Sequence, residues 1–458
     1  MLDCFAKDED GAVPLMPVGE PDLAGWLDGE PARLSTWLRA MGFQAKAGTW
    51  CGLPDPTGRL EAVAVGLGER ADLWSAGGLA HALPQGTYRL DGGGSWQADF
   101  VLGWALGAYR FERYRKGPRE PARLVLPASE GCARAARIAE AVCWARDLIN
   151  TPAGDMGPVE LAEAATSLAA EFAGTSTVTV GDDLLAANFP AIHAVGRASS
   201  RAPRLIDLAW GDDGAPKVTL VGKGVCFDSG GLDLKPAQSM LRMKKDMGGA
   251  ACVLAVARMV MAENLAVRLR VLIPAVDNAV DGNAYRPMDV VASRQGLAIE
   301  IGDTDAEGRV ILADALSEAA SASPDLIVDM ATLTGAARTA LGTDLPALFA
   351  NDKALSRETI AAGSAVGEDL WPIPIWQDYR ERLKSDIADI ANIANWDYAD
   401  HIQAALFLES FVGTGVPWLH VDTFCWQLED RPGRPKGGDP QGARAVFELL
   451  RRRYGAGT

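Results

Sequence analysis

Acidic side chains with the right type and spacing for metal chemistry gather in two stretches of the chain. The first stretch holds Asp228 and Asp246, and the second holds Asp303, Asp305 and Glu307. Each follows a segment expected to be a strand and is rich in glycine. Carboxylates placed this close together repel one another unless cations neutralise them. Oxygen ligands without histidine favour divalent ions such as Mg²⁺, Mn²⁺ or Zn²⁺.

Histidine contributes little to any such site. The four histidines stand too far apart in the sequence for an HExxH or HxH zinc motif: His81, His193, His401 and His420. A zinc site built mainly on imidazole is therefore excluded. Carboxylates must supply most of the ligands of any metal that this protein holds.

These stretches also fit other, less specific patterns. An isolated Asp228-Ser-Gly-Gly segment is most often a turn. The stretch from Asp303 imitates the start of an EF-hand loop, but that loop needs a preceding helix, and residues 298–301 are typical of a strand. The segment Gly222-Lys-Gly lacks a phosphate-loop pattern, and Ser229 lacks the context of a nucleophile elbow. The joint occurrence of the acidic residues, rather than any one of them, favours a metal site.

The elements expected around these residues alternate between strand and helix. Apolar runs predict strands at 218–221, 268–273 and 325–328, and helical spacing predicts helices at 250–261 and 312–319. Such alternation predicts an α/β fold: a smaller amino-terminal α/β domain followed by a larger catalytic α/β domain, with a mixed, largely parallel central sheet flanked by helices. Ligands are then expected at the carboxyl ends of the strands.

Domain limits follow from composition. Residues 1–130 are expected to form the amino-terminal domain, which includes a helix predicted at 100–115. An Ala-rich linker helix is predicted over 131–150 and ends where Asn150 precedes Thr-Pro. Residues 151–458 are expected to form the catalytic domain.

Composition restricts partners and location. The 458 residues carry 44 Lys+Arg against 60 Asp+Glu, a net charge of −16, which disfavours a surface that grips nucleic acid or anionic lipid. Seven scattered cysteines without a CxxC pair suit a reducing compartment. The amino terminus lacks a signal-peptide pattern, and no apolar run is long enough for a membrane span. We expect a cytoplasmic protein that has no membrane partner.

Several motifs together resemble the leucine aminopeptidase (cytosol aminopeptidase) family of dinuclear metallo-exopeptidases. The strongest is Thr304-Asp-Ala-Glu-Gly-Arg, supported by Val221-Gly-Lys-Gly, Phe227-Asp-Ser-Gly-Gly and Lys245-Asp-Met-Gly-Gly. The resemblance runs from about residue 145 to 452, and the amino-terminal third matches only loosely. It implies a leucyl aminopeptidase type of hydrolase that releases N-terminal amino acids from short peptides, in peptide turnover. It also implies a homohexamer, a dimer of trimers.

The resemblance also implies a ligand set for two divalent ions per subunit, Mn²⁺ or Zn²⁺ before Mg²⁺ or Co²⁺. The implied metal ligands are Lys223, Asp228, Asp246, Asp305 and Glu307. In relatives, the residues matching Asp228 and Glu307 bridge the two ions. Because Asp305 and Glu307 are two residues apart, an extended backbone would place both side chains on one face. Lys223 must lose its proton to act as a ligand, which adjacent cations favour.

The family mechanism implies roles for two more residues. A hydroxide that bridges the metal ions attacks the first peptide carbonyl, and Lys235 resembles the catalytic lysine that steadies the oxyanion. Arg309 resembles the arginine that holds a bicarbonate acting as general base. The alternative for Arg309 is a surface arginine with no such role. Its position just before a helix predicted at 310–320 also suits an anion.

Specificity is less well determined by the motifs. Positions that match the family's substrate pockets are Met243, Asp303, Thr332 and Gly335. Asp303 stands where the family usually has Asn, so we hypothesise a preference for a basic or small polar second residue; no bias is the alternative. Met243 alone could be core packing. The segment Asp439-Pro-Gln-Gly442 has longer and more polar side chains than the family's usual loop, which argues against a strict preference for leucine.

One alternative belongs to a different functional class. Some relatives also act as DNA-binding or regulatory proteins on the same scaffold. Such a role needs a basic groove, and the longest uninterrupted run of Lys and Arg is only Arg451–Arg453. A degenerate homologue without activity is the remaining alternative, but no residue required by the motifs is missing.

Overall fold

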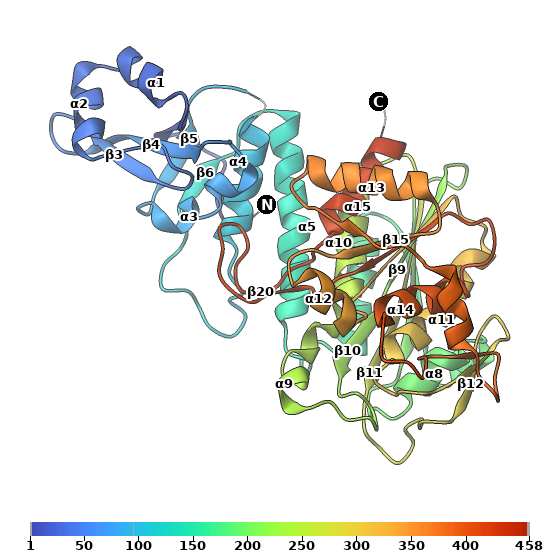
Figure 1. The fold of residues 1–458 in the computed structure, drawn as a ribbon. Coiled ribbons are helices and arrows are strands. Elements are labelled where there is room, and N and C mark those ends of the chain that lie inside the picture. The colour runs from blue at the N-terminus through green and yellow to red at the C-terminus, as the bar shows by residue number, and fades with distance from the viewer. Residues whose placement is uncertain (1, 95, 456–458) are drawn as a thin grey trace. The chain divides into compact units, whose positions relative to one another are not determined.

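The computed structural model describes residues 2–94 and 96–455, which form two compact units. Residues 1–143 with 427–436 make the first unit, and residues 144–426 with 437–458 make the second. The smaller α/β unit and the larger one with a mixed, largely parallel sheet confirm the predicted fold class (Figure 1). The domain limits at 130 and 150 stay predictions.

A six-stranded sheet forms the core of the first unit, in the order β1-β6-β5-β2-β4-β3, with only β3 antiparallel to its neighbour. Its strands are β1 (Phe5–Ala6), β2 (Val13–Gly19), β3 (Trp50–Pro54), β4 (Leu60–Gly68), β5 (Thr87–Leu90) and β6 (Arg123–Val125). Its helices are α1 (Leu23–Gly29), α2 (Ala32–Ala40), α3 (Leu79–Ala82) and α4 (Trp96–Ala108), with the 3-10 helix η1 (Leu73–Ala76).

Helix α4 differs from the prediction of a helix over 100–115, because it ends at Ala108. The ring nitrogen Nε2 of His81 lies 3.1 Å from the carbonyl oxygen of Ala108 and satisfies that helix end. Residues 109–116 are then rich in charge and no longer supply an apolar face. The next helix, α5 (Glu130–Asn150), begins within the first unit and ends within the second.

A nine-stranded sheet forms the core of the second unit, in the order β16-β15-β18-β14-β9-β11-β8-β7, with β10 also paired to β11. The central pairs β18-β14, β14-β9, β9-β11 and β11-β10 are parallel, and the pairs β15-β18, β11-β8 and β8-β7 are antiparallel. The strands are β7 (Thr175–Val180), β8 (Arg204–Trp210), β9 (Lys217–Gly222), β10 (Gly224–Asp228), β11 (Arg268–Asn278), β14 (Leu326–Ala331), β15 (Ala347–Ala350), β16 (Trp371–Pro372) and β18 (Trp418–Asp422).

Helices cover both faces of this sheet (Figure 1), with α10 and α15 on one side and α11 and α14 on the other. The larger helices are α6 (Pro158–Glu171), α8 (Pro190–Gly196), α10 (Gly248–Ala262), α11 (Glu307–Ser321), α12 (Gly335–Leu341), α13 (Lys353–Ala365), α14 (Asp400–Glu409) and α15 (Ala443–Tyr454). The shorter helices are α7 (Asp183–Ala186), α9 (Ala237–Met240), η2 (Met243–Met247) and η3 (Gln377–Leu383). The remaining strands are β12 (Val290–Ala292), β13 (Ala298–Glu300), β17 (Ile390–Ala391), β19 (Trp426–Gln427) and β20 (Gly437–Gly438).

The central strands are buried almost throughout, as parallel strands covered on both faces must be. The strand β13 precedes the Asp303 segment, so the helix that an EF-hand loop would need is absent there. Two glycines allow close packing at the edge of the sheet. A Cβ on Gly222 would lie 2.6 Å from the Cα of Ala250, and one on Gly249 would lie 2.1 Å from the carbonyl oxygen of Met330. Helix α10 can therefore begin directly against β9 and β14.

Candidate metal centre

The carboxyl ends of the central strands bring the predicted ligands to one edge of the sheet. Lys223 directly follows β9, and Asp228 is the last residue of β10. Asp246 lies in η2, immediately before α10. Glu307 is the first residue of α11, so that helix begins three residues earlier than predicted. The strand ends thus bring together residues that are far apart along the chain.

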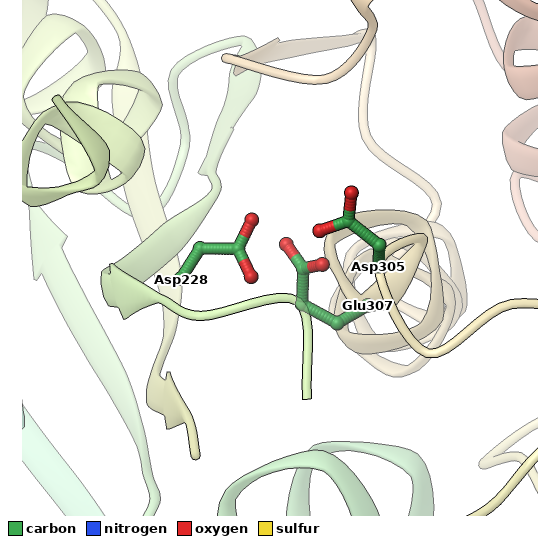
Figure 2. Close-up of side chains that lie close together, drawn as sticks. All are labelled: Asp228, Asp305 and Glu307. Carbon is green, nitrogen blue, oxygen red and sulfur yellow. The ribbon is translucent and has the colours of Figure 1, made fainter. Parts of the chain in front are cut away.

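Three carboxylates converge most closely. One oxygen each from Asp228, Asp305 and Glu307 lies within 4.8 Å of the other two, and Figure 2 shows their carboxyl groups turned toward one another. Asp228 is 2% exposed and Glu307 is 0% exposed, whereas the side chain of Asp305 keeps 32% of its surface in solvent. This is the geometry of an oxygen-lined cation site that is open on the side of Asp305.

Two lysines complete the cluster. The Nζ atom of Lys223 lies 2.7 Å from Oδ2 of Asp246 and 2.9 Å from Oε1 of Glu307. It also donates a hydrogen bond to the carbonyl oxygen of Thr332, at 3.1 Å. The Nζ atom of Lys235 lies 2.7 Å from Oδ2 of Asp228 and forms an ion pair with Asp305. The structure therefore places all five predicted ligands and Lys235 in one cluster.

The electrostatics of this cluster are strained. Burial raises the pKa of Glu307 to about 8, and the neighbouring carboxylate of Asp228 adds to the shift. Burial and Asp228 likewise raise the pKa of Asp305 to about 7. Burial lowers the pKa of Lys223, but the carboxylates of Asp246, Glu307 and Asp228 outweigh it and raise that pKa above its usual value. The four carboxylates outnumber the three ammonium groups beside them, because Lys245 also lies 3.6 Å from Oδ1 of Asp246, and a cation would neutralise the excess negative charge.

One oxygen in the cluster points to a ligand from outside the chain. Oε1 of Glu307 is fully buried and receives no hydrogen bond from residues 2–94 or 96–455, although Lys223 lies close to it. Buried polar atoms normally have a hydrogen-bond partner, and those without one call for an explanation. A divalent cation would supply that partner, so the donors present fit a metal.

Two residues that support the cluster were not predicted from the sequence. Asn278, the last residue of β11, donates from Nδ2 to Oδ1 of Asp228 at 2.9 Å and to the carbonyl oxygen of Thr304 at 3.0 Å. Asp422, the last residue of β18, accepts hydrogen bonds from the backbone N–H of Leu333 and the hydroxyl of Thr334. Both end a buried strand, which is the same signal that identified Asp228, and that signal could have found them.

Two of the four predicted pocket residues, Thr332 and Asp303, contact residues of the cluster. Met243 opens η2 and is half-buried, and Gly335 opens α12 and is exposed. The hydroxyl of Thr332 donates to Oδ1 of Asp246, at 2.8 Å. Asp303 accepts a hydrogen bond from the backbone N–H of Asp305 at 2.7 Å, and burial raises its pKa. Thr332 and Asp303 thus also hold Asp246 and Asp305 in place through hydrogen bonds, independently of any role in substrate preference.

The polar loop at 439–442 has roles within the fold. Asp439 is buried and accepts two hydrogen bonds from Arg146, at 3.1 and 3.0 Å. Gln441 donates to the carbonyl oxygen of Thr343 and accepts from the backbone N–H of Cys425. These contacts anchor the loop, so its polar character has a structural cause.

Arg309 is buried, not a surface arginine. It lies in the first turn of α11 and is 3% exposed. Its Nη1 donates to the carbonyl oxygen of Asn392 at 2.9 Å, and its Nη2 donates to Oδ1 of Asp400 at 2.7 Å. The alternative of a surface arginine is therefore wrong. A surface arginine would expose its charged group to water, whereas this one is buried.

Elsewhere, all seven cysteines are buried and none forms a disulfide. Within residues 2–94 and 96–455, the structure contains no helix with the length and apolar character that a membrane span requires.

Comparisons with known proteins agree over most of the chain. The family model described as "Cytosol aminopeptidase family, catalytic domain" matches residues 143–447, and that of the "M17 aminopeptidase, N-terminal domain" matches residues 13–127. A probable cytosol aminopeptidase of Roseiflexus castenholzii is 41% identical over 372 residues, 77% of this chain and 76% of the relative. One of Geobacter sp. (strain M21) is 38% identical over 454 residues, 90% of each chain.

Two solved structures share the fold throughout. The cytosol aminopeptidase from Coxiella burnetii has 49% sequence identity and a TM-score of 0.94, covering 99% of this chain and 100% of its own. The bottromycin maturation enzyme BotP in complex with Mn has 37% identity and a TM-score of 0.87, covering 96% of this chain and 99% of its own. The similarity thus extends into the amino-terminal third, which the sequence motifs matched only loosely.

Proposed function

The chain belongs to the cytosol aminopeptidase family and is an aminopeptidase, and from this premise we propose a metal-dependent mechanism for it. Two divalent ions are held by five side chains: Lys223, Asp228, Asp246, Asp305 and Glu307. The enzyme uses these ions to release the N-terminal residue from short peptides. The observation that carries this proposal is the convergence of these side chains at the ends of β9 and β10 and at the start of α11.

Manganese or zinc is the metal that we propose. A related protein, BotP, has been solved in complex with Mn, and mixed oxygen and nitrogen donors also suit Zn²⁺. Two bound ions would supply Lewis acidity and a water molecule that ionises near neutral pH. For its part, the chain must release the proton of Lys223, whose pKa is raised by the carboxylates around it. Metal binding is therefore expected to release protons to solvent.

Lys235 is the proposed electrophile. Burial lowers its pKa, but the carboxylates of Asp228, Glu307 and Asp246 outweigh this effect and keep the pKa above its usual value. The side chain therefore stays an ammonium group at neutral pH and can donate a hydrogen bond. Its Nζ atom lies beside Asp228 and Asp305, next to the part of the cluster that is open to solvent. From there it can stabilise negative charge that develops on a peptide carbonyl oxygen.

Arg309 is the residue that would hold a bicarbonate, which would supply a general base at this site. Its Nε atom is buried and has no hydrogen-bond partner within residues 2–94 and 96–455. A buried N–H without an acceptor is unfavourable, and an oxyanion would satisfy it.

Substrate preference, assembly and location complete the proposal. Met243, Asp303, Thr332 and Gly335 are the proposed contacts to the first two residues of the peptide. A homohexamer follows from the family resemblance alone. A cytoplasmic location is supported by the names of the relatives and by seven buried, unpaired cysteines, which suit a reducing compartment.

Hydrolysis of a set of aminoacyl-p-nitroanilides tests this function. The purified chain would be freed of metal and reconstituted with Mn²⁺, Zn²⁺ or Mg²⁺. We expect activity to return with metal, and Asp305→Ala and Lys235→Ala to reduce kcat/KM by about a hundredfold or more. Asp397→Ala, at an exposed carboxylate outside the cluster, is the control for charge removal. Wild-type rates in both variants, or full activity in the metal-free protein, would contradict the mechanism.

A further inference from the structure

The guanidinium group of Arg309 is held from one side by two groups that come from outside α11. Asn392, which follows β17, supplies a carbonyl oxygen to Nη1, and Asp400, the first residue of α14, supplies a carboxylate oxygen to Nη2. Neither contact was predicted, because both partners lie more than eighty residues away along the chain (separations of 83 and 91 residues).

These two contacts fix the direction of the third nitrogen. A guanidinium group is planar, so fixing both terminal nitrogens also fixes the plane and the direction of the Nε–H bond. That Nε atom is buried and lacks an acceptor within residues 2–94 and 96–455. Since the arginine is 3% exposed, this N–H is shielded from bulk solvent. The group is thus oriented for an acceptor that the chain does not provide.

The backbone around both partners is tightly held. Asp400 follows Ala399, whose φ of 54° is a left-handed conformation that is uncommon for a residue other than glycine. The side chain of Asn392 accepts from the N–H of Gly302 at 2.7 Å and donates to the carbonyl oxygen of Asp303, also at 2.7 Å. Asn392 therefore connects Arg309 to the segment that presents Asp305.

We propose that Asp400 is a positioning residue for an anion site at Arg309: it holds the guanidinium so that Nε–H donates to a small planar oxyanion, bicarbonate in the first instance. The inference rests on the proposed function and extends it to a residue that no motif identified. The carboxylate of Asp400 is also a like charge for the anion. Its side chain is 32% exposed, however, so solvent screens that repulsion, whereas the orienting hydrogen bond persists.

Substitutions at Asp400 separate orientation from charge. Asp400→Ala removes both the hydrogen bond and the charge, and Asp400→Asn removes the charge but keeps an oxygen acceptor. Asp397→Ala removes an exposed carboxylate three residues earlier and is the matched control. Bicarbonate would be titrated into the metal-loaded full chain, with binding measured by calorimetry and kcat and KM measured at fixed pH in closed, carbon-dioxide-free buffer.

We expect Asp400→Ala to bind bicarbonate about tenfold more weakly than the wild type and to need correspondingly more bicarbonate for full kcat, with KM for the peptide unchanged. Asp400→Asn should restore most of the affinity, and Asp397→Ala should behave as the wild type. Equal or tighter binding by Asp400→Ala would overturn the inference, because charge would then outweigh orientation. If the wild type itself neither binds nor responds to bicarbonate, the anion role of Arg309 falls together with this inference, while metal-dependent hydrolysis would stand.

Discussion

Two buried polar clusters lie on the same sheet, and they balance their charges differently. At the end of β9 and β10, the carboxylates around Glu307 outnumber the lysines that face them. In the middle of the neighbouring strands β14 and β18, one carboxylate, Asp329, meets one imidazole, His420, at 2.5 Å. Asp329 also accepts a hydrogen bond from the indole N–H of Trp418 at 2.6 Å.

The second cluster is complete within the chain. Burial lowers the pKa of His420, but the carboxylate of Asp329 outweighs it and raises that pKa. The imidazole also contacts the rings of Phe349 and Trp418, at centroid distances of 5.7 and 6.3 Å. A satisfied, balanced pair of this kind stabilises a fold, whereas excess carboxylates with raised pKa values are typical of a functional site. The difference indicates which buried charges serve chemistry.

The largest effect that would distinguish the clusters is on catalysis. We expect Glu307→Gln to reduce kcat/KM by about a thousandfold or more, because it removes a proposed charged ligand of the metal ions. The same change should leave the metal-free fold as stable as before, or more stable, because it removes a carboxyl group whose ionisation is opposed by burial and by Asp228. Steady-state kinetics and thermal unfolding of the metal-free protein measure the two effects. If Glu307→Gln lost stability but kept its activity, Glu307 would be a structural residue and not a functional one.

A substitution in the balanced cluster of Asp329 and His420 should reduce stability and leave catalysis nearly unchanged. Asp329→Asn leaves His420 without its carboxylate, and we expect the free energy of unfolding to fall by about 3 kcal/mol. The rate per folded, metal-loaded molecule should stay within about threefold of the wild type. Denaturant titration and kinetics on the same preparation check both statements. Unchanged stability would show that the pair is not the structural element we describe.

The metal-free protein should lose stability as pH rises. The pKa of Glu307 is about 8 in the folded chain against a usual 4.5, so the folded state binds more protons than the unfolded state between these values. The free energy of unfolding then falls with increasing pH, on the order of 2 kcal/mol between pH 6 and 8. Glu307→Gln should remove much of this slope. Denaturant midpoints across this range, with chelator present, would show it, and a rising slope would contradict the pKa shift.

The smallest effect concerns substrate choice. If Asp303 contacts the second residue of the substrate, Asp303→Asn should reduce kcat/KM for Xaa-Lys relative to Xaa-Glu dipeptides by about threefold, because a half-exposed charge is screened. A dipeptide panel measures the ratio in both proteins. Equal kcat/KM for Lys and Glu in the wild type would show that Asp303 serves only the backbone N–H of Asp305.

Much of the fold and the site could be predicted from local sequence. Apolar runs located β9, β11 and β14, and the carboxylates that follow them are where strand ends place ligands. The signature around Asp305 and Glu307 is contiguous, so it can be recognised without long-range information. Helix limits were less predictable: α4 ends at Ala108, whose carbonyl oxygen lies 3.1 Å from Nε2 of His81, and no pattern near Ala108 encodes that contact.

The sequence by itself determined the α/β class, the kinds of ligand and the excess of carboxylates over lysines, because these depend on residue type and short-range periodicity. Tertiary structure decided which buried groups lack a partner. Asn278 reaches Asp228 across 50 residues, and Asp400 reaches Arg309 across 91. A hydrogen bond requires atoms to meet within about 3 Å, and only the packing of distant elements brings such atoms together. For that reason the oriented, unpartnered Nε–H of Arg309 became visible in the folded chain alone.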